Sequence, residues 1–536
     1  MENGADSGSL TRRQLLRMIG VTAGNAAMYQ AMSSLGFAAE SPYRGPIDLQ
    51  GAPRDASVLI LGAGMAGMTA AYELRNAGYR VQLLEYNGRA GGRNWSLRGG
   101  DTYTELGGLT QHCQFDQDLY INPGPWRIPY HHRGMLNYCK RLGVPLEAFV
   151  QINYNAYLHS TRAFGGKPQR YREIKADYQG QVAELLAKAT RQHALDASVS
   201  REDQEKLLAS LREWGALDRN YAYVAGDASS DRRGYKKKPG GGLSARPIPS
   251  EPMGLRDVLD SKLWQAIPIG DSYDWQTALF QPVGGMGRIG EAFGRELGPL
   301  IRYRARVTDI HQDAQGVSVQ YEDLQSPGSK LTARSDWCLC TIPLSVLAQI
   351  PMNVGPGMAA AIAAVPYGAA VKVGLQFKRR FWEEDDHIYG GISYTDLPIT
   401  NIGYPSSGYH SGGKGVLLGA YIYGVDAMEF TAMTPDERVQ KAVDYGSQIH
   451  PQYRGEFDNG VAVAWHRSPF AMGCYGMWNS DTRARHYDDL CQIDQRIALA
   501  GEHASYLAGW QEGAVTSALD AVERLHVRAV AQAGKA

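Results

Sequence analysis

Three glycines and one carboxylate carry the clearest chemical signal in the sequence. Gly62, Gly64 and Gly67 have the spacing G-x-G-x-x-G, and Glu85 follows about 20 residues later. Glycines at this spacing provide a tight turn, close approach of the backbone to a pyrophosphate, and close packing of a helix on a strand. An acid at the later position accepts hydrogen bonds from ribose hydroxyls. The pattern predicts a dinucleotide-binding site.

The elements that would position these residues surround them. Val58–Leu61 is a short apolar run typical of a buried strand, and Met65–Arg75 is predicted to form a helix. Val81–Leu84 would form a second strand that ends at the carboxylate. The helix begins at Met65 and Ala66, where free N–H groups and the positive end of the helix dipole would face the phosphates.

The residues after Glu85 distinguish FAD from NAD. Arg89, Gly91, Gly92 and Arg93 follow the second strand. This stretch resembles the E-x-x-x-R-x-G-G-R signature of monoamine oxidases, L-amino-acid oxidases and their relatives. A guanidinium at Arg93 can add a charge-assisted bond to a phosphate. The resemblance therefore places the chain with the flavin amine oxidases and implies FAD, with solvated surface arginines as the alternative.

The same resemblance implies further contacts with FAD. Gly107 and Gly108 form a glycine pair expected near the flavin ring, and Val307 would contact the adenine through its backbone. The C-terminal segment resembles the closing signature G-E-H…G-[WY]-x-x-G-A, whose helix would direct its dipole at the flavin pyrimidine. The cofactor residues implied there are Gly501, Glu502, Gly509, Trp510, Gly513, Ala514 and Val515.

A candidate for substrate binding lies in the segment Gly124–Pro129. This segment resembles the G-P-x-R-[LI]-P pattern of L-amino-acid oxidases, with Arg127 at the position of the arginine. A planar guanidinium forms a bidentate clamp on a carboxylate and would fix the Cα atom of an amino acid over the flavin. The alternative is that Arg127 makes a structural salt bridge.

Five more residues are assigned to the substrate site by resemblance. Lys372 occupies a strand position where this superfamily keeps a lysine near flavin N5, and a buried cation there stabilises negative charge as reduced flavin meets O₂. A lysine extending from a strand end to solvent is the alternative. Trp510 and Tyr475 would wall the substrate slot, Trp465 lines up with the Tyr475 wall, and Tyr404 would hydrogen-bond the substrate carboxylate.

The six cysteines are scattered and have neither disulfide-framework nor metal-site spacing, so no metal is predicted. Gly473-Cys474-Tyr475 matches the segment in which monoamine oxidases carry covalent FAD on the cysteine. L-amino-acid oxidases usually lack this cysteine. We therefore expect a buried free thiol and non-covalent FAD, with a Cys474–flavin bond as the alternative.

The chain has 536 residues, which is too long for one core and predicts two or three domains. The expected fold class is α/β, with a Rossmann-like FAD-binding domain of the glutathione-reductase type, an α+β substrate domain and a helical insertion. The FAD-binding domain is assigned to residues 50–108, 273–345 and 455–530, the substrate domain to 109–165 and 346–454, and the helical domain, with a flexible basic loop, to 166–272.

Residues 1–39 are predicted to be a targeting segment outside the fold. Arg12 and Arg13 precede a modestly apolar stretch, as in a bacterial twin-arginine signal, which predicts a periplasmic or secreted protein. A basic disordered tail is the alternative. Lys+Arg and Asp+Glu both number 55, so no net charge favours nucleic acid or an anionic membrane. No apolar run is long enough to span a membrane, and relatives suggest a homodimer.

The resemblance implies an FAD-dependent L-amino-acid oxidase, whose partners are a small L-amino acid and O₂. Hydride would pass from Cα to flavin N5, the imino acid would hydrolyse to a 2-oxo acid and ammonia, and O₂ would be reduced to H₂O₂. Three alternatives stay open: a primary-amine (monoamine) oxidase, which would not need Arg127, an amide-forming amino-acid 2-monooxygenase, and a non-oxidase flavin-binding electron-transfer protein. The preferred side chain is not determined by the sequence.

Overall fold

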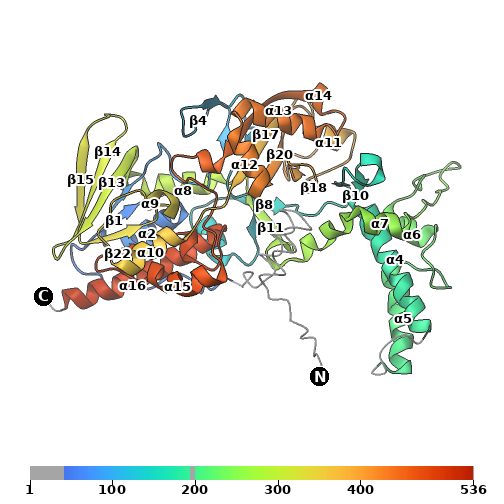
Figure 1. Ribbon diagram of the computed structural model, residues 1–536, viewed down its shortest axis with the longest axis horizontal. Coiled ribbons are helices and arrows are strands. Elements are labelled where there is room, and N and C mark those ends of the chain that lie inside the picture. The colour runs from blue at the N-terminus through green and yellow to red at the C-terminus, as the bar shows by residue number, and fades with distance from the viewer. Residues whose placement is uncertain (1–40, 193–198, 535–536) are drawn as a thin grey trace, which may run out of the picture.

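Three groups of secondary structure lie along the long axis of the molecule (Figure 1). The computed structural model describes residues 41–192 and 199–534. A parallel sheet with its helices lies at one end, a larger mixed sheet lies in the middle, and a group of helices lies at the other end. The predicted signal, residues 1–39, lies outside the described residues.

The first group is built on a parallel sheet of five strands in the order β12-β2-β1-β16-β22. Its strands are β1 (Ser57–Leu61), β2 (Arg80–Leu84), β12 (Ile301–Arg302), β16 (Trp337–Cys340) and β22 (Ile497–Leu499). All neighbouring pairs are parallel. The strands come from three distant parts of the chain. The fold is therefore α/β, with the FAD-binding Rossmann-like topology that the sequence predicts.

Alternation along β1 divides its side chains between two cores. Val58 and Ile60 pack in the cluster beneath helices α2 (Met65–Asn76) and α16 (Gln511–Ala533), whereas Leu59 and Leu61 belong to the cluster on the opposite face. Successive strand residues point to opposite faces, so a strand covered on both sides is apolar throughout. That second face is covered in part by the antiparallel sheet of β13 (Ala305–Gln312), β14 (Val317–Asp323) and β15 (Lys330–Ser335).

The central group contains a seven-stranded sheet in the order β10-β9-β18-β19-β20-β17-β21. Its strands are β9 (Tyr157–His159), β10 (Gln169–Arg170), β17 (Ala370–Phe377), β18 (Ile392–Thr395), β19 (Asn401–Gly403), β20 (Gly415–Tyr423) and β21 (Phe457–Ala464). Helices α11 (Phe381–Glu384), α12 (Gly424–Ala432), α13 (Pro435–Gly446) and α14 (Tyr453–Glu456) accompany it. β21 pairs with β17, so the assignment of residues from 455 onward to the FAD domain is wrong for β21.

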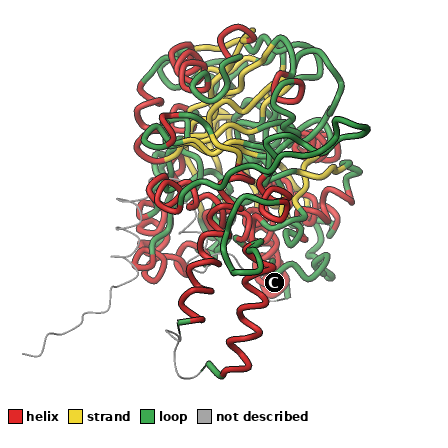
Figure 2. The backbone as a smooth tube through the Cα atoms, turned by 90° about the vertical axis from the view of Figure 1, so that its right-hand side faces the viewer, coloured by secondary structure: helices red, strands yellow, loops and turns green. Residues whose placement is uncertain are grey.

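The third group projects from the body of the molecule. It comprises α4 (Tyr171–Arg191), α5 (Arg201–Gly215), α6 (Asp227–Arg233) and α7 (Leu255–Ser261). Figure 2 shows α4 and α5 extending beyond the sheets as a pair. The predicted basic loop is partly helical, and its Arg233 is buried in an ion pair with Asp177 at 2.8 Å. The start of the segment predicted as a flexible loop is therefore fixed at Arg233.

A small antiparallel sheet of β7 (Ile128–Pro129), β11 (Leu279–Pro282) and β8 (Leu146–Phe149) joins segments assigned to different domains. The remaining strands are β3 (Leu97–Arg98), β4 (Thr102–Thr104), β5 (Thr110–His112) and β6 (Tyr120–Ile121). The remaining α-helices are α3 (Arg133–Arg141), α8 (Gly287–Leu297), α9 (Leu344–Leu347), α10 (Pro356–Ala364) and α15 (Ser480–Cys491). None of the described helices combines the length and hydropathy that crossing a membrane requires.

Candidate active site

A cavity of about 600 Å³ begins at the carboxyl ends of β1 and β2 and reaches the seven-stranded sheet at Tyr421. Ligands of open α/β sheets bind at this edge. The walls include many of the residues selected from the sequence: Gly62, Gly64, Met65, Ala66, Glu85, Gly92, Arg93, Val307, Trp465, Cys474, Tyr475, Gly501, Glu502, Gly509, Trp510 and Ala514.

The glycine loop has the geometry that its spacing predicts. A Cβ atom on Gly67 would lie 2.0 Å from the carbonyl oxygen of Gly62, so only glycine lets α2 approach β1 this closely. Gly62 has φ of +101°, which favours glycine. A Cβ on Gly64 would meet no described atom within 4 Å, because this position faces the open cavity. Gly67 is thus a packing residue, and Gly64 leaves room for a ligand.

Glu85 is held rigidly at the end of β2 on the cavity wall. Its carboxylate accepts hydrogen bonds from the backbone N–H of Ala63 at 2.6 Å and of Asn87 at 2.8 Å, and its exposure is 4%. A carboxylate fixed by two backbone donors keeps oxygen lone pairs available for hydroxyl groups of a ligand.

Arg93 and Glu502 connect two segments of the cavity wall that lie far apart in the sequence. Arg93 donates to a Glu502 carboxylate oxygen at 2.9 Å and to the carbonyl oxygen of Cys474 at 2.6 Å. Glu502 also accepts from the backbone N–H groups of Gly476 and Gly509. Glu502 therefore organises three loops of the wall, a role that the sequence did not indicate.

Six predicted cofactor residues do not line the cavity: Gly67, which packs α2 on β1, and five more. The Arg89 guanidinium lies over the Trp95 ring at 4.3 Å and donates to the Gly92 carbonyl oxygen. Gly107 and Gly108 are exposed turn residues between β4 and β5, where their positive φ angles serve the hairpin. At the start of α16, a Cβ on Gly513 would clash with Ser505 and Leu507, and Val515 is buried in the core. These five residues support the walls from outside in this structure, and their contact with FAD stays a prediction.

Lys372 is a buried amine on β17. Its Nζ atom donates to the carbonyl oxygens of Asn122 at 3.2 Å and Gly124 at 2.6 Å and lies 4.0 Å from the centre of the Tyr421 ring. Burial, reinforced by the charge of Arg127, lowers its pKa from 10.5 to about 7. Lys372 is therefore poised to gain or lose a proton near neutral pH, and it is not a lysine that extends to solvent.

Aromatic side chains form part of the cavity wall. Trp465 is buried, donates from its indole nitrogen to the Pro123 carbonyl oxygen at 2.8 Å, and lines the cavity together with Tyr475 and Trp510. Trp510 is the N-cap residue of α16, so this ring is positioned by the start of the helix. The three rings that the sequence assigned to the slot are brought to one cavity by the fold.

Arg127 lies beside Trp510 in an aromatic enclosure at the edge of the cavity. Its Cζ atom is 4.9 to 5.9 Å from the ring centres of Trp126, Phe149, Trp275 and Trp510. The residue is 8% exposed, and its Nε atom has no hydrogen-bond partner among the described residues. Nor does any carboxylate of the described chain form an ion pair with it. The structure thus gives no support to a structural salt bridge at Arg127.

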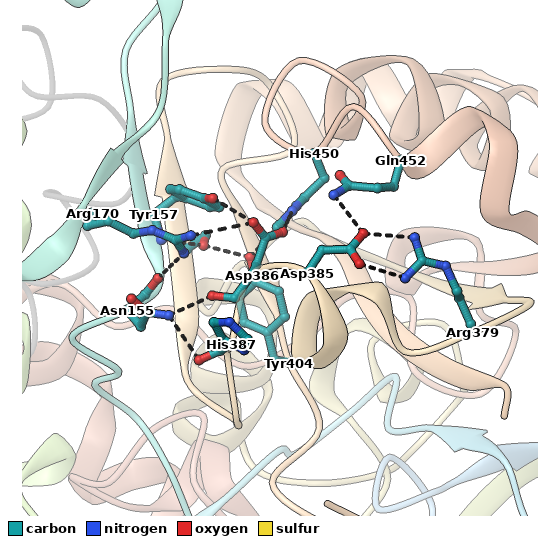
Figure 3. A network of polar contacts seen from close by, with 11 residues as sticks. Asn155, Tyr157, Arg170, Arg379, Asp385, Asp386, His387, Tyr404, His450 and Gln452 are labelled. Carbon is teal, nitrogen blue, oxygen red and sulfur yellow. Dashed lines mark hydrogen bonds and ion pairs between the residues drawn. The ribbon is translucent and has the colours of Figure 1, made fainter. Parts of the chain in front are cut away.

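Tyr404 lies in a buried polar network outside the main cavity, so its predicted bond to the substrate stays a prediction. Its hydroxyl lies 2.7 Å from Ser393 Oγ and 2.6 Å from His450 Nε2, and His450 Nδ1 lies 2.9 Å from Asp386. Figure 3 shows this network, which Tyr157 joins through Asp386. Tyr404 does not line the main cavity, and burial raises its pKa well above 10. The residue secures the core of the seven-stranded sheet.

The cavity also has walls that sequence reasoning missed. Thr341, Ile342 and Pro343 line it where β16 ends, and Tyr86 and Phe470 contribute rings. Pro343, three residues after the end of β16, was a usable signal, since parallel strands end at a common ligand-binding edge. Phe470 carries no such local signal.

Cys474 has a protonated, half-buried thiol on the cavity wall. Burial raises its pKa to about 11, although the charges of Arg93 and Lys372 oppose this effect. Such a thiol is a poor nucleophile at neutral pH because the thiolate is the reactive form.

Comparison with known proteins identifies the family. The family model for flavin containing amine oxidoreductases matches residues 65–526. The chain belongs to this family. L-amino-acid oxidase of the fish Siganus canaliculatus is 26% identical over 89% of this chain and 86% of that protein. L-amino-acid oxidase of the viper Vipera ammodytes ammodytes is 28% identical over 87% and 91%, respectively.

Solved structures agree on the fold. Putrescine oxidase bound to putrescine superposes with a TM-score of 0.57 at 16% identity, covering 89% of this chain and 99% of that chain. The family implies FAD, and the cavity of this flavin amine oxidase fits that group. The space at Gly64, the N-terminus of α2 and the anchored carboxylate of Glu85 match a pyrophosphate and a ribose.

Proposed function

We propose that this enzyme is an L-amino-acid oxidase that converts L-amino acids with O₂ to 2-oxo acids, ammonia and H₂O₂. One observation carries the proposal: Arg127 is a buried guanidinium without a carboxylate partner among the residues that the structure describes. A buried charge is costly unless it is paired. A substrate carboxylate would supply the missing partner, whereas a simple amine would leave the charge unpaired.

The residues around Arg127 would orient the substrate. A bidentate clamp at Arg127 fixes one end of the amino acid, and the rings of Trp510, Tyr475 and Trp465 confine the rest. The aromatic enclosure excludes water and strengthens the ion pair. FAD, when bound, supplies the redox chemistry by accepting hydride and returning electrons to O₂.

Lys372 would supply a proton or a positive charge beside the reacting atoms. Its Nζ atom is fixed by two carbonyl oxygens and has a pKa of about 7. A cation at this place stabilises negative charge as O₂ is reduced. The Cys474 thiol favours non-covalent FAD, because it is protonated at neutral pH.

A primary-amine oxidase is the second candidate. The Gly473-Cys474-Tyr475 segment on the cavity wall favours it. Arg127 argues against this function, because a simple amine has no negative charge to pair with the guanidinium. An amide-forming amino-acid 2-monooxygenase would use the same clamp and differ only in its products.

Peroxide release tests the proposal. Purified yellow enzyme is assayed with the twenty L-amino acids and with the amines that result from their decarboxylation. We expect peroxide from amino acids only, together with 2-oxo acid and ammonia. Arg127→Met should lower kcat/KM for the best amino acid on the order of 100-fold, as expected for loss of a buried charge-assisted pair.

Arg133→Met is the matched control, because Arg133 lies on the same segment but is exposed. It should leave peroxide release unchanged. Peroxide from amines that persists in Arg127→Met would refute the proposal in favour of an amine oxidase. An amide product would favour the monooxygenase.

We further propose export through the twin-arginine route and assembly as a homodimer, on the basis of Arg12-Arg13 and of the family resemblance. Fractionation of bacteria expressing the wild type and an Arg12→Lys/Arg13→Lys variant tests export. The variant should accumulate in the cytoplasm. Sedimentation of the purified enzyme tests the dimer.

A further inference from the structure

We propose that His131, His132 and Asp274 form a binding site for a divalent transition-metal ion, with Zn²⁺ as the preferred occupant. The site lies next to the aromatic enclosure of Arg127 but outside the main cavity. It is independent of the oxidase proposal, because it rests on its own three side chains.

The three side chains converge on one point. One nitrogen of each histidine and one carboxylate oxygen of Asp274 all lie within 4.8 Å of one another. His131 Nε2 is 3.3 Å from Asp274 Oδ1. Tetrahedral Zn²⁺, with bonds of about 2.0–2.1 Å, needs donor atoms roughly 3.3 Å apart. One pair of donors already has that spacing, and a small side-chain movement would bring in the third.

The same atoms lack other partners. His131 Nδ1 and Nε2, His132 Nε2 and Asp274 Oδ1 have no hydrogen bond to any described residue. The three residues are 1–3% exposed. Buried polar groups are nearly always satisfied, so this concentration of unsatisfied donor and acceptor atoms favours a bound ligand. A metal ion would satisfy all three side chains together.

The local structure holds the donors in place. His132 is the N-cap residue of α3, and Asp274 lies in the short 3₁₀ helix Tyr273–Trp275. The ring of Tyr273 stacks on His131 at 4.2 Å, and the ring of His132 lies edge-on to Trp510 at 5.0 Å. Both imidazoles are therefore fixed by aromatic contacts that leave ring nitrogens free.

The donor set selects the class of metal. Two imidazoles and one carboxylate suit Zn²⁺ and its neighbours, whereas Mg²⁺ and Ca²⁺ prefer oxygen ligands throughout. Three protein ligands leave a fourth position for water.

A metal here would connect two segments that border the substrate site. His131 and His132 follow β7, four and five positions after Arg127, and Asp274 precedes Trp275, whose ring lies 4.9 Å from the Arg127 Cζ atom. The ion would thus crosslink both sides of the enclosure. We expect it to act as a structural clamp, which raises the temperature of unfolding.

Zn²⁺ titration of the FAD-loaded enzyme, prepared without a polyhistidine tag and treated with a chelator, tests the site. Calorimetry should show one Zn²⁺ bound per chain, and Zn²⁺ should raise Tm. His131→Gln and Asp274→Asn should each weaken Zn²⁺ binding by at least about 100-fold, since even the partners of metal ligands contribute 10- to 100-fold. The exposed residue His311 gives the matched control His311→Gln, which should bind as the wild type does.

X-ray absorption of the Zn²⁺-loaded wild type identifies the metal ligands directly and does not depend on the folding of a variant. Two imidazoles and one carboxylate in the first coordination shell would support it. A shell without imidazole, wild-type enzyme that takes up no Zn²⁺, or folded variants that bind Zn²⁺ as tightly as the wild type would each overturn it.

Discussion

Arg93 donates to Glu502 at 2.9 Å, across 409 positions of the chain, and so ties the loop after β2 to the loop after β22. Both residues line the cavity. Because Glu502 also accepts from the Gly476 and Gly509 N–H groups, one carboxylate holds three wall segments together.

The Glu502→Ala variant tests this connection. It leaves the Arg93 charge and two backbone donors unpaired in a largely buried place, where loss of one partner of an ion pair costs about 3 kcal/mol. We expect a comparable loss of unfolding free energy in urea, together with weaker FAD retention on gel filtration. Glu523→Ala on the exposed face of α16 is the control. Equal stability of the two variants would contradict the proposed role.

Two glycine variants separate packing from cofactor binding. Gly67→Ala places a Cβ atom 2.0 Å from the Gly62 carbonyl oxygen, so α2 must move and stability should fall by about 1–3 kcal/mol. Gly64→Ala meets no described atom within 4 Å and should leave the flavin-free protein as stable as the wild type. Its methyl group would, however, occupy space meant for the pyrophosphate.

Thermal unfolding of flavin-free protein and FAD titration followed by flavin fluorescence measure the two effects. Gly64→Ala should weaken FAD binding without a change in the Tm of the flavin-free protein. Full FAD affinity in Gly64→Ala would show that the cofactor does not approach this position.

Lys372 should make stability depend on pH. Its pKa is about 7 in the folded protein and 10.5 when unperturbed. Between these values the unfolded chain holds a proton that the folded protein lacks, so the free energy of unfolding rises with pH in this window. Below pH 7 both states are protonated, and this gain is absent.

Comparison with Lys372→Met isolates this contribution. From pH 7 to pH 9 the wild type should gain about 2–3 kcal/mol relative to the variant, at 1.36 kcal/mol per pKa unit. Urea unfolding at several pH values measures the difference. Parallel curves for the two proteins would show that folding does not lower the pKa of the Lys372 amine.

Acid precipitation decides how the flavin is held. The high pKa of the Cys474 thiol predicts non-covalent FAD, so all yellow colour should stay in the supernatant. Cys474→Ser should behave like the wild type. A yellow pellet from the wild type and a colourless pellet from Cys474→Ser would establish a covalent bond instead.

Much of the cofactor site could be predicted from local sequence. The strand at Val58–Leu61, the glycine spacing and the carboxylate at Glu85 are neighbours along the chain, and their chemistry depends on backbone geometry that short segments encode. The same reasoning did not place Gly107, Gly108 and Gly513, which lie outside the cavity lining, because a glycine that serves a hairpin or a helix contact has the same signature as one that faces a cofactor.

By itself, the sequence determined the α/β class, the dinucleotide loop and Arg127 as a candidate for binding a carboxylate. Only the tertiary structure decided which side chains share a cavity, because that depends on packing between segments far apart in the chain. Tyr404 forms a hydrogen bond with His450, Phe470 lines the cavity, and Asp274 lies beside His131 and His132. Local sequence patterns do not indicate these contacts, because the burial of apolar faces, and not proximity in the sequence, brings these segments together.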